Sequence, residues 1–145
     1  MLMMRSIVRV AVSIGALATL AACGSDAGTG VRASVTGSYQ LTTVNGQALP
    51  FTESSSGAVI KVTGGTLTAE SSGAFTEAIT RSTTPPGGAT TSATATATGT
   101  FTVSGSVIVF TFAGASGPVG TLLGSLTSSG LSIQNGTDSF EFKKQ

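Results

Sequence analysis

Cys23 is the only cysteine among the 145 residues, and it directly follows the apolar segment that opens the chain. A thiol is a strong nucleophile once ionised, so this residue is the first candidate for covalent chemistry. The stretch from Leu20 to Ala22 ends in two alanines, whose small side chains let an extended peptide lie in a peptidase groove. Arg5 precedes the apolar run, and Arg9 interrupts its start. This order of charged, apolar and small residues is typical of a secretory signal peptide.

The two alanines followed by Cys23 resemble the lipobox of bacterial lipoproteins. This resemblance implies transfer of a diacylglyceryl group to the Cys23 thiol, cleavage before it and acylation of the new N-terminus. Membrane lipid is then a partner of the protein, because two or more acyl chains anchor a protein stably. The alternatives are an ordinary signal peptide with a chance cysteine, or an internal apolar helix. The run from Ile7 to Ala22 contains Arg9 and is shorter than the ~20 apolar residues of a spanning helix.

The residue after the cysteine bears on localisation. In lipoproteins of two-membrane bacteria an aspartate there is associated with retention in the inner membrane, whereas this chain has Gly24. The resemblance therefore implies the outer membrane of the cell envelope, facing the periplasm. We expect a signal peptide over 1–22, a lipidated flexible tether over 23–33 and a single β domain over 34–145. Loss of Arg5 and Arg9 leaves five basic and six acidic side chains, without the basic stripe of a nucleic-acid binder.

Few residues of the domain are suited to catalysis. The chain has no histidine, which removes the commonest general base. Glu70 and Glu77 lie on neighbouring expected strands and could form the carboxylate pair of a glycosidase. Glu77 is in phase with Phe75 and Ile79, so it could point inward, and Arg81 shares that face. We favour an edge-strand charge or a Glu77–Arg81 surface pair over catalysis, and expect no enzyme.

Metal and cofactor sites are not expected either. Asp138 and Glu141 could bind calcium weakly, but EF-hand spacing is absent. The glycine-rich stretch from Gly114 to Pro118 lacks the lysine of a phosphate-binding loop. The glycosylation sequon that begins at Asn135 is interpreted as incidental in a bacterial lipoprotein.

The domain shows short alternations of apolar and polar residues, separated by turn signals such as Asn45-Gly46 and Gly64-Gly65. Regular short strands of this kind predict an all-β sandwich or barrel, and no window shows the period of a helix. The final two runs are either one bulged strand or two short ones. The expected strands are 38–44, 58–63, 66–70, 74–83, 91–103, 106–113, 119–127, 131–134 and 139–143.

Two strands have informative faces. Ile108, Phe110 and Phe112 share one face of a strand that is apolar on both sides for part of its length, which predicts a central position. Over 91–103, threonines alternate with alanine and glycine, and threonine suits an exposed strand face. On the opposite, small face, either another element packs closely or the strand lines a cavity. Phe140 and Phe142 are also expected to share a face.

The opening Gly37-Ser38-Tyr39-Gln40-Leu41, followed by Val44-Asn45-Gly46 and Leu49-Pro50, is similar to the start of lipocalin-like bacterial lipoprotein domains. Tyr39 stands at the aromatic position that is tryptophan in classical lipocalins. The resemblance implies a closed, antiparallel, up-and-down barrel of about eight strands with an apolar interior. A barrel of this size is either filled by side chains or holds one small ligand. We therefore expect a small apolar or amphipathic ligand, or alternatively a structural or interaction protein of the envelope with a filled core.

Overall fold

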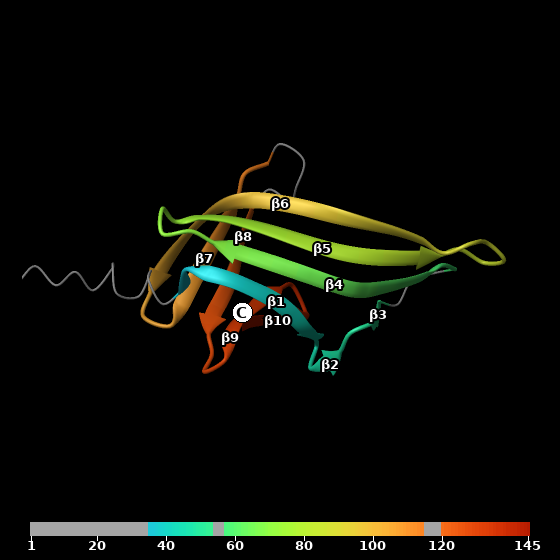
Figure 1. Cartoon of the computed structure of the whole chain (residues 1–145), viewed down its shortest axis with the longest axis horizontal. Helices are drawn as coiled ribbons and strands as arrows, with labels where there is room; N and C mark the ends of the chain where they lie inside the picture. The colour runs from blue at the N-terminus through green and yellow to red at the C-terminus, as the bar shows by residue number, and fades with distance from the viewer. Residues whose placement is uncertain (1–34, 54–56, 115–119) are drawn as a thin grey trace, which may run out of the picture.

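A computed structural model describes residues 35–53, 57–114 and 120–145 of the chain (Figure 1). Every regular element from Gly37 onward in these ranges is a strand, which confirms the all-β prediction. The strands are β1 (Gly37–Val44), β2 (Gln47–Ala48), β3 (Phe51–Glu53), β4 (Val59–Ala69), β5 (Ala74–Thr84), β6 (Thr91–Ser104), β7 (Val107–Phe112), β8 (Gly120–Leu126), β9 (Gly130–Asn135) and β10 (Asp138–Lys144).

Eight of these strands form a closed barrel. From β4 to β10 each strand pairs antiparallel with the next one in the chain, and β10 then pairs with β1. The antiparallel pairing of β1 with β4, from Gly37 opposite Ala69 to Gln40 opposite Thr66, closes the ring. The structure is thus the up-and-down barrel and not the sandwich. The short strands β2 and β3 flank it, and neither was expected from the sequence.

One predicted turn is wrong. Gly64-Gly65 lies inside the continuous strand β4, where the pairing with β5 shifts register between Val62 and Gly64. Such a β-bulge bends a strand without ending it. A Cβ on Gly65 would lie 2.7 Å from the Cδ1 atom of Ile79 and 3.1 Å from the Leu41 Cβ. This glycine is therefore required for close packing across the barrel and does not mark a turn.

Other local expectations are confirmed. Asn45 and Gly46 both have positive φ and form the two-residue connection between β1 and β2, as expected for an Asn-Gly hairpin turn. The final two runs are separate strands, β9 and β10, which pair with each other. The Leu49–Pro50 peptide bond, between β2 and β3, is cis.

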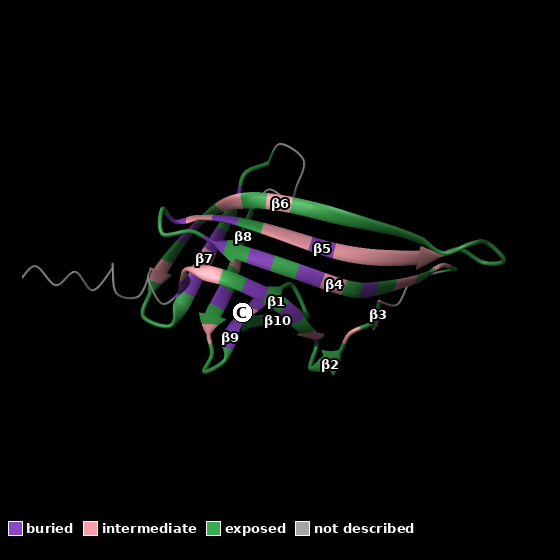
Figure 2. Cartoon of the chain, viewed as in Figure 1, coloured by how far each residue is buried: buried purple, intermediate pink, exposed green. Residues whose placement is uncertain are grey.

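The core is built from the inward faces of the strands (Figure 2). Phe110 is fully buried; its ring lies 5.1 Å from the Phe75 ring and 6.1 Å from the Phe101 ring, centroid to centroid. The predicted buried faces of β7 and β10 are confirmed. β7 is also central, because β6 and β8 flank it. Val107 on its outward side nevertheless remains 47% exposed, because none of the described elements covers the outside of β7.

One end of the barrel is closed. Val35, the first residue described, is fully buried where β1 begins, and its carbonyl accepts a hydrogen bond from the buried Tyr39 hydroxyl. The Lys144 Nζ lies 5.7 Å from the centre of the Tyr39 ring. We call this the closed end. The barrel closes on itself, and the buried core side chains of the described residues form one cluster inside it.

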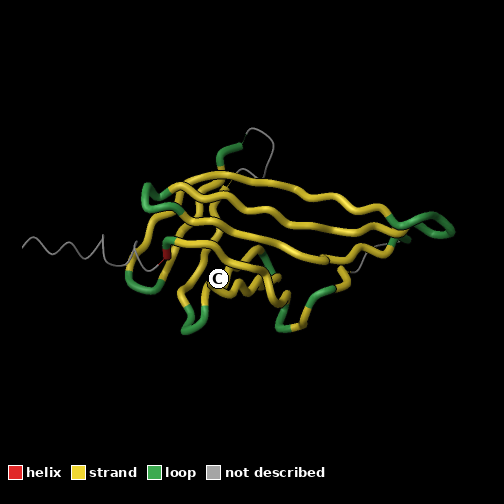
Figure 3. The backbone as a smooth tube through the Cα atoms, in the orientation of Figure 1, coloured by secondary structure: helices red, strands yellow, loops and turns green. Residues whose placement is uncertain are grey.

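At the opposite, open end, β4, β5 and β6 run on beyond the other strands (Figure 3). β5 pairs with β6 as far as Thr83 opposite Thr91, whereas β7 pairs with β6 only from Gly99 onward. Among the described strands, none flanks the other side of β6 before Gly99. The extension forms one tall wall at the open end. Its threonine face is exposed, as predicted.

Candidate functional site

A pocket of about 350 Å³ lies at the open end of the barrel. The residues around it come from the extended wall and from the facing strands, and most of them are apolar. They are Glu77, Ile79, Arg81, Ala95, Thr96, Ala97, Phe112, Leu122, Ile133, Asn135 and Phe140.

The small face of β6 makes room for this pocket. Across the β5–β6 pair, Ala97 lies opposite Glu77 and Ala95 lies opposite Ile79. Methyl side chains at these two positions leave space that larger residues would fill. Further along the strand, a Cβ on Gly99 would lie 2.0 Å from the Thr111 carbonyl oxygen. The small face of β6 was expected either to pack closely against another element or to line a cavity. It does both: it packs closely at Gly99 and lines the pocket at Ala95 and Ala97.

Aromatic and aliphatic side chains form the floor of the pocket. Phe112 is buried there, with its ring 5.0 Å from the Phe75 ring in an edge-on arrangement. Leu122, Ile133 and Phe140 line the side that faces the extended wall. The half of the barrel below is filled by the phenylalanine cluster. The interior is therefore filled towards the closed end and open above Phe112.

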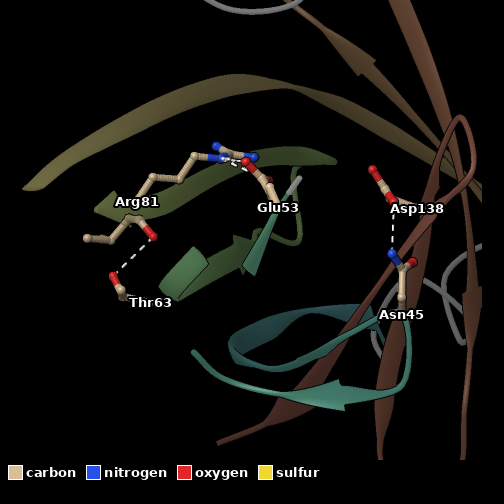
Figure 4. A network of polar contacts seen from close by, with 6 residues as sticks. Asn45, Glu53, Thr63, Arg81 and Asp138 are labelled. Atoms are coloured by element: carbon tan, nitrogen blue, oxygen red, sulfur yellow. Dashed lines mark hydrogen bonds and ion pairs between the residues drawn. The ribbon is translucent and has the colours of Figure 1, made fainter. Parts of the chain in front are cut away.

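Arg81 and Glu53 form an ion pair at the rim (Figure 4). The Arg81 Nε donates to both carboxylate oxygens of Glu53, at 3.2 and 3.4 Å. Glu53 belongs to β3, which pairs with β4 and so comes within reach of Arg81 across the sheet. The expected Glu77–Arg81 surface pair is therefore wrong as an ion pair. The alternation in Phe51-Thr52-Glu53 was the available signal for β3, but three residues are too few to stand out.

Glu77 points inward, as its phase with Phe75 and Ile79 predicted, and it lines the pocket. Burial raises the pKa of its carboxyl group above the ordinary value, and the positive charge of Arg81 offsets part of that rise. The raised pKa means that water solvates the carboxylate poorly in this position.

Glu70 is not brought together with Glu77. It lies in the exposed turn after β4, at the closed end, where it accepts a hydrogen bond from the Ser72 hydroxyl at 3.2 Å. Its backbone N–H bonds the Ala74 carbonyl, and Glu77 lies three residues further along β5, about 10 Å of strand. Glu70 and Glu77 are therefore too far apart to act together on one substrate as a pair of catalytic carboxylates.

Asp138 and Glu141 are also held apart. The Asn45 side-chain amide donates to the Asp138 carboxylate at 2.8 Å (Figure 4). Strand alternation puts Asp138 and Glu141 on opposite faces of β10, so the two cannot chelate one ion. No group of three or more potential metal ligands occurs among the described residues. Asn135, which starts the sequon, lines the pocket.

No family model matches the chain, and neither the curated proteins nor the solved structures contain a match. Cys23, the expected signal peptide over 1–22, the tether over 23–33 and most of the glycine-rich stretch that begins at Gly114 lie outside the described residues. In the part of the chain that is described, no helix has the length and apolar character needed to cross a membrane.

Proposed function

We propose that the protein is a lipid-anchored lipoprotein of the bacterial cell envelope, with Cys23 acylated in the outer membrane and the domain facing the periplasm. We further propose that the barrel binds a small apolar or amphipathic ligand through its open end. The observation that carries the second proposal is the pocket of about 350 Å³ above Phe112. Small-molecule sites span roughly 300–1,000 Å³ and combine apolar walls with a few polar groups, as this pocket does.

The position of the pocket suits an anchored protein. The described part of the barrel begins with Val35 at the closed end, where β1 begins, and the pocket opens at the other end. A lipid attached through Cys23 would therefore leave the open end free. A ligand could enter from the aqueous side without displacing the anchor.

A second candidate function has its own observation. Val107 and Leu123 are 47% and 58% exposed on the outside of β7 and β8, and Val109 lies directly opposite Leu123. Exposed apolar patches mark interaction surfaces. An interaction protein of the envelope would use this patch and leave the pocket empty.

Native mass spectrometry of the mature protein, gently purified from the envelope of its host, distinguishes the two. We expect the wild type to carry a stoichiometric small-molecule adduct. Ala95→Phe places a ring in the pocket from the small face of β6 and should remove the adduct. Thr98→Phe adds the same ring on the exposed face of β6 and should keep it. A wild type free of adduct rejects ligand binding in favour of the second candidate, and an adduct retained by Ala95→Phe rejects this pocket as its site.

A further inference from the structure

The charged side chains in and beside the pocket do not balance. Glu77 and Arg81 are the charged side chains among the described residues that line the pocket, and Glu53 adjoins them through Arg81. Two carboxylates thus accompany one guanidinium, and the three groups carry a net charge of −1 when ionised. Thr96 and Asn135, the other polar lining residues, are neutral.

The Arg81 guanidinium is bonded to Glu53, the more exposed of the two carboxylates. Arg81 bonds both oxygens of Glu53 through Nε, at 3.2 and 3.4 Å. Both side chains are about one-third exposed, at 37% and 31%, so water also solvates this pair at the rim. The second carboxylate, on Glu77, lies deeper, and within the described ranges the charge that favours its ionised form is that of Arg81.

The immediate surroundings of Glu77 are apolar. Leu67 on β4 and Ala97 on β6 lie directly opposite it in the sheet, and Phe75 and Ile79 flank it on the inward face of β5. Glu77 is half-buried, so water screens its attraction to an opposite charge less than at the surface of the protein. A half-buried carboxylate without a bonded cation is less stable than one fully in water.

Resting on the proposed ligand-binding function, we infer that Glu77 makes the pocket selective for ligands that join an apolar body to a cationic amine. The apolar body would contact Phe112, Leu122 and Phe140 on the floor. The ammonium group would bind the Glu77 carboxylate and bring the summed charge of Glu53, Glu77 and Arg81 to zero.

Other ligand classes fit this arrangement less well. An anionic head group would face Glu77 at close range and would have to displace Glu53 from Arg81. A neutral head group would leave the Glu77 charge without a counter-ion. The predicted order of affinity for one apolar body is therefore amine, then alcohol, then carboxylate.

Titration of residues 24–145 with octylamine, octanol and octanoate at neutral pH, followed by amide chemical shifts in NMR spectra, tests this order. We expect octylamine to bind about tenfold or more tightly than octanol, since close charge pairs contribute at least the roughly 1.4 kcal/mol of one decade. Glu77→Gln should abolish this preference, because it removes the charge that distinguishes the amine from the alcohol. Glu70→Gln is the matched control; it removes the same charge from the exposed turn at the closed end and should preserve the preference.

Each result has a distinct meaning. Equal affinity for the three compounds, or tightest binding of octanoate, overturns the amine selectivity and leaves the ligand-binding function intact. A preference that survives Glu77→Gln overturns the role of this residue. If none of the three compounds shifts resonances of the open end in the wild type or in Glu77→Gln, the proposed function itself fails and the inference fails with it.

Discussion

The close approach of Gly124 to the Phe110 ring allows a direct test of how the core is packed. Gly124 lies on β8 opposite Ile108 on β7. A Cβ added to Gly124 would lie 2.8 Å from the Cε2 atom of Phe110 and 3.2 Å from the Ser132 carbonyl oxygen. The first distance is too short for any real contact, and the Phe110 ring is fully buried between Phe75 and Phe101. The ring cannot move aside without disturbing both neighbours.

The two single substitutions should destabilise the protein for opposite reasons. Gly124→Ala overpacks the core, which typically costs about 1–3 kcal/mol. Phe110→Ala removes a fully buried ring and should cost about 3–5 kcal/mol. In the Phe110→Ala background, however, the new methyl group enters vacated space, and replacing a strand glycine by alanine stabilises by roughly 0.5–1 kcal/mol. Gly124→Ala should therefore change sign, from destabilising to neutral or stabilising.

Urea unfolding of the four proteins, residues 24–145, followed by far-ultraviolet circular dichroism measures this coupling from the midpoints at constant slope. The Ser132 contact is present in both backgrounds and cancels in the cycle. Leu123→Ala is the control. The Leu123 side chain, next to Gly124 in the sequence, is 58% exposed, so its loss should cost less than about 0.5 kcal/mol. Additivity of Gly124→Ala and Phe110→Ala within about 0.5 kcal/mol would refute the packing on which this reasoning depends.

Three further predictions concern other parts of the chain. Cys23→Ser should abolish lipidation and leave an unprocessed precursor on immunoblots; a mature-sized, membrane-bound product would contradict the proposed anchor. Tyr39→Phe should cost about 1–3 kcal/mol in urea unfolding, because it leaves the buried Val35 carbonyl without its donor; a loss below 0.5 kcal/mol, about the size of a neutral surface change, would contradict the closed end. Burial raises the pKa of Glu77, so the folded state binds the carboxyl proton more tightly than the unfolded state. Wild-type stability should therefore fall as pH rises from about 4.5, the ordinary pKa of the group, through its raised pKa in the folded state. Glu77→Gln should then be more stable than wild type near neutral pH and equal to it at acidic pH, with Glu70→Gln as the control; a pH-independent difference would contradict the burial of this carboxyl group.

Local patterns in the sequence determined much of the fold. The alternation of Ile108, Phe110 and Phe112 predicted which face of β7 is buried, and the threonines of β6 predicted which of its faces is exposed. Asn45-Gly46 predicted a hairpin turn because its two positive φ angles are a property of those two residues. The inward direction of Glu77 followed from its phase with Phe75. Each of these predictions needed only neighbours along one strand or turn.

Tertiary structure decided the features that depend on register between distant segments. The pairing of β1 with β4 distinguishes the barrel from the sandwich, and both architectures share the same local alternation. Gly65 has the composition of a turn residue, and only the position of Ile79 across the sheet makes it part of a bulged strand. Arg81 pairs with Glu53 and not with Glu77 because the short strand β3, which local patterns do not reveal, pairs with β4 and brings Glu53 within reach. The pocket arises in the same way: the alanines of β6 showed that space was available, but only the closure of the ring determined that Phe112 and the facing strands enclose it.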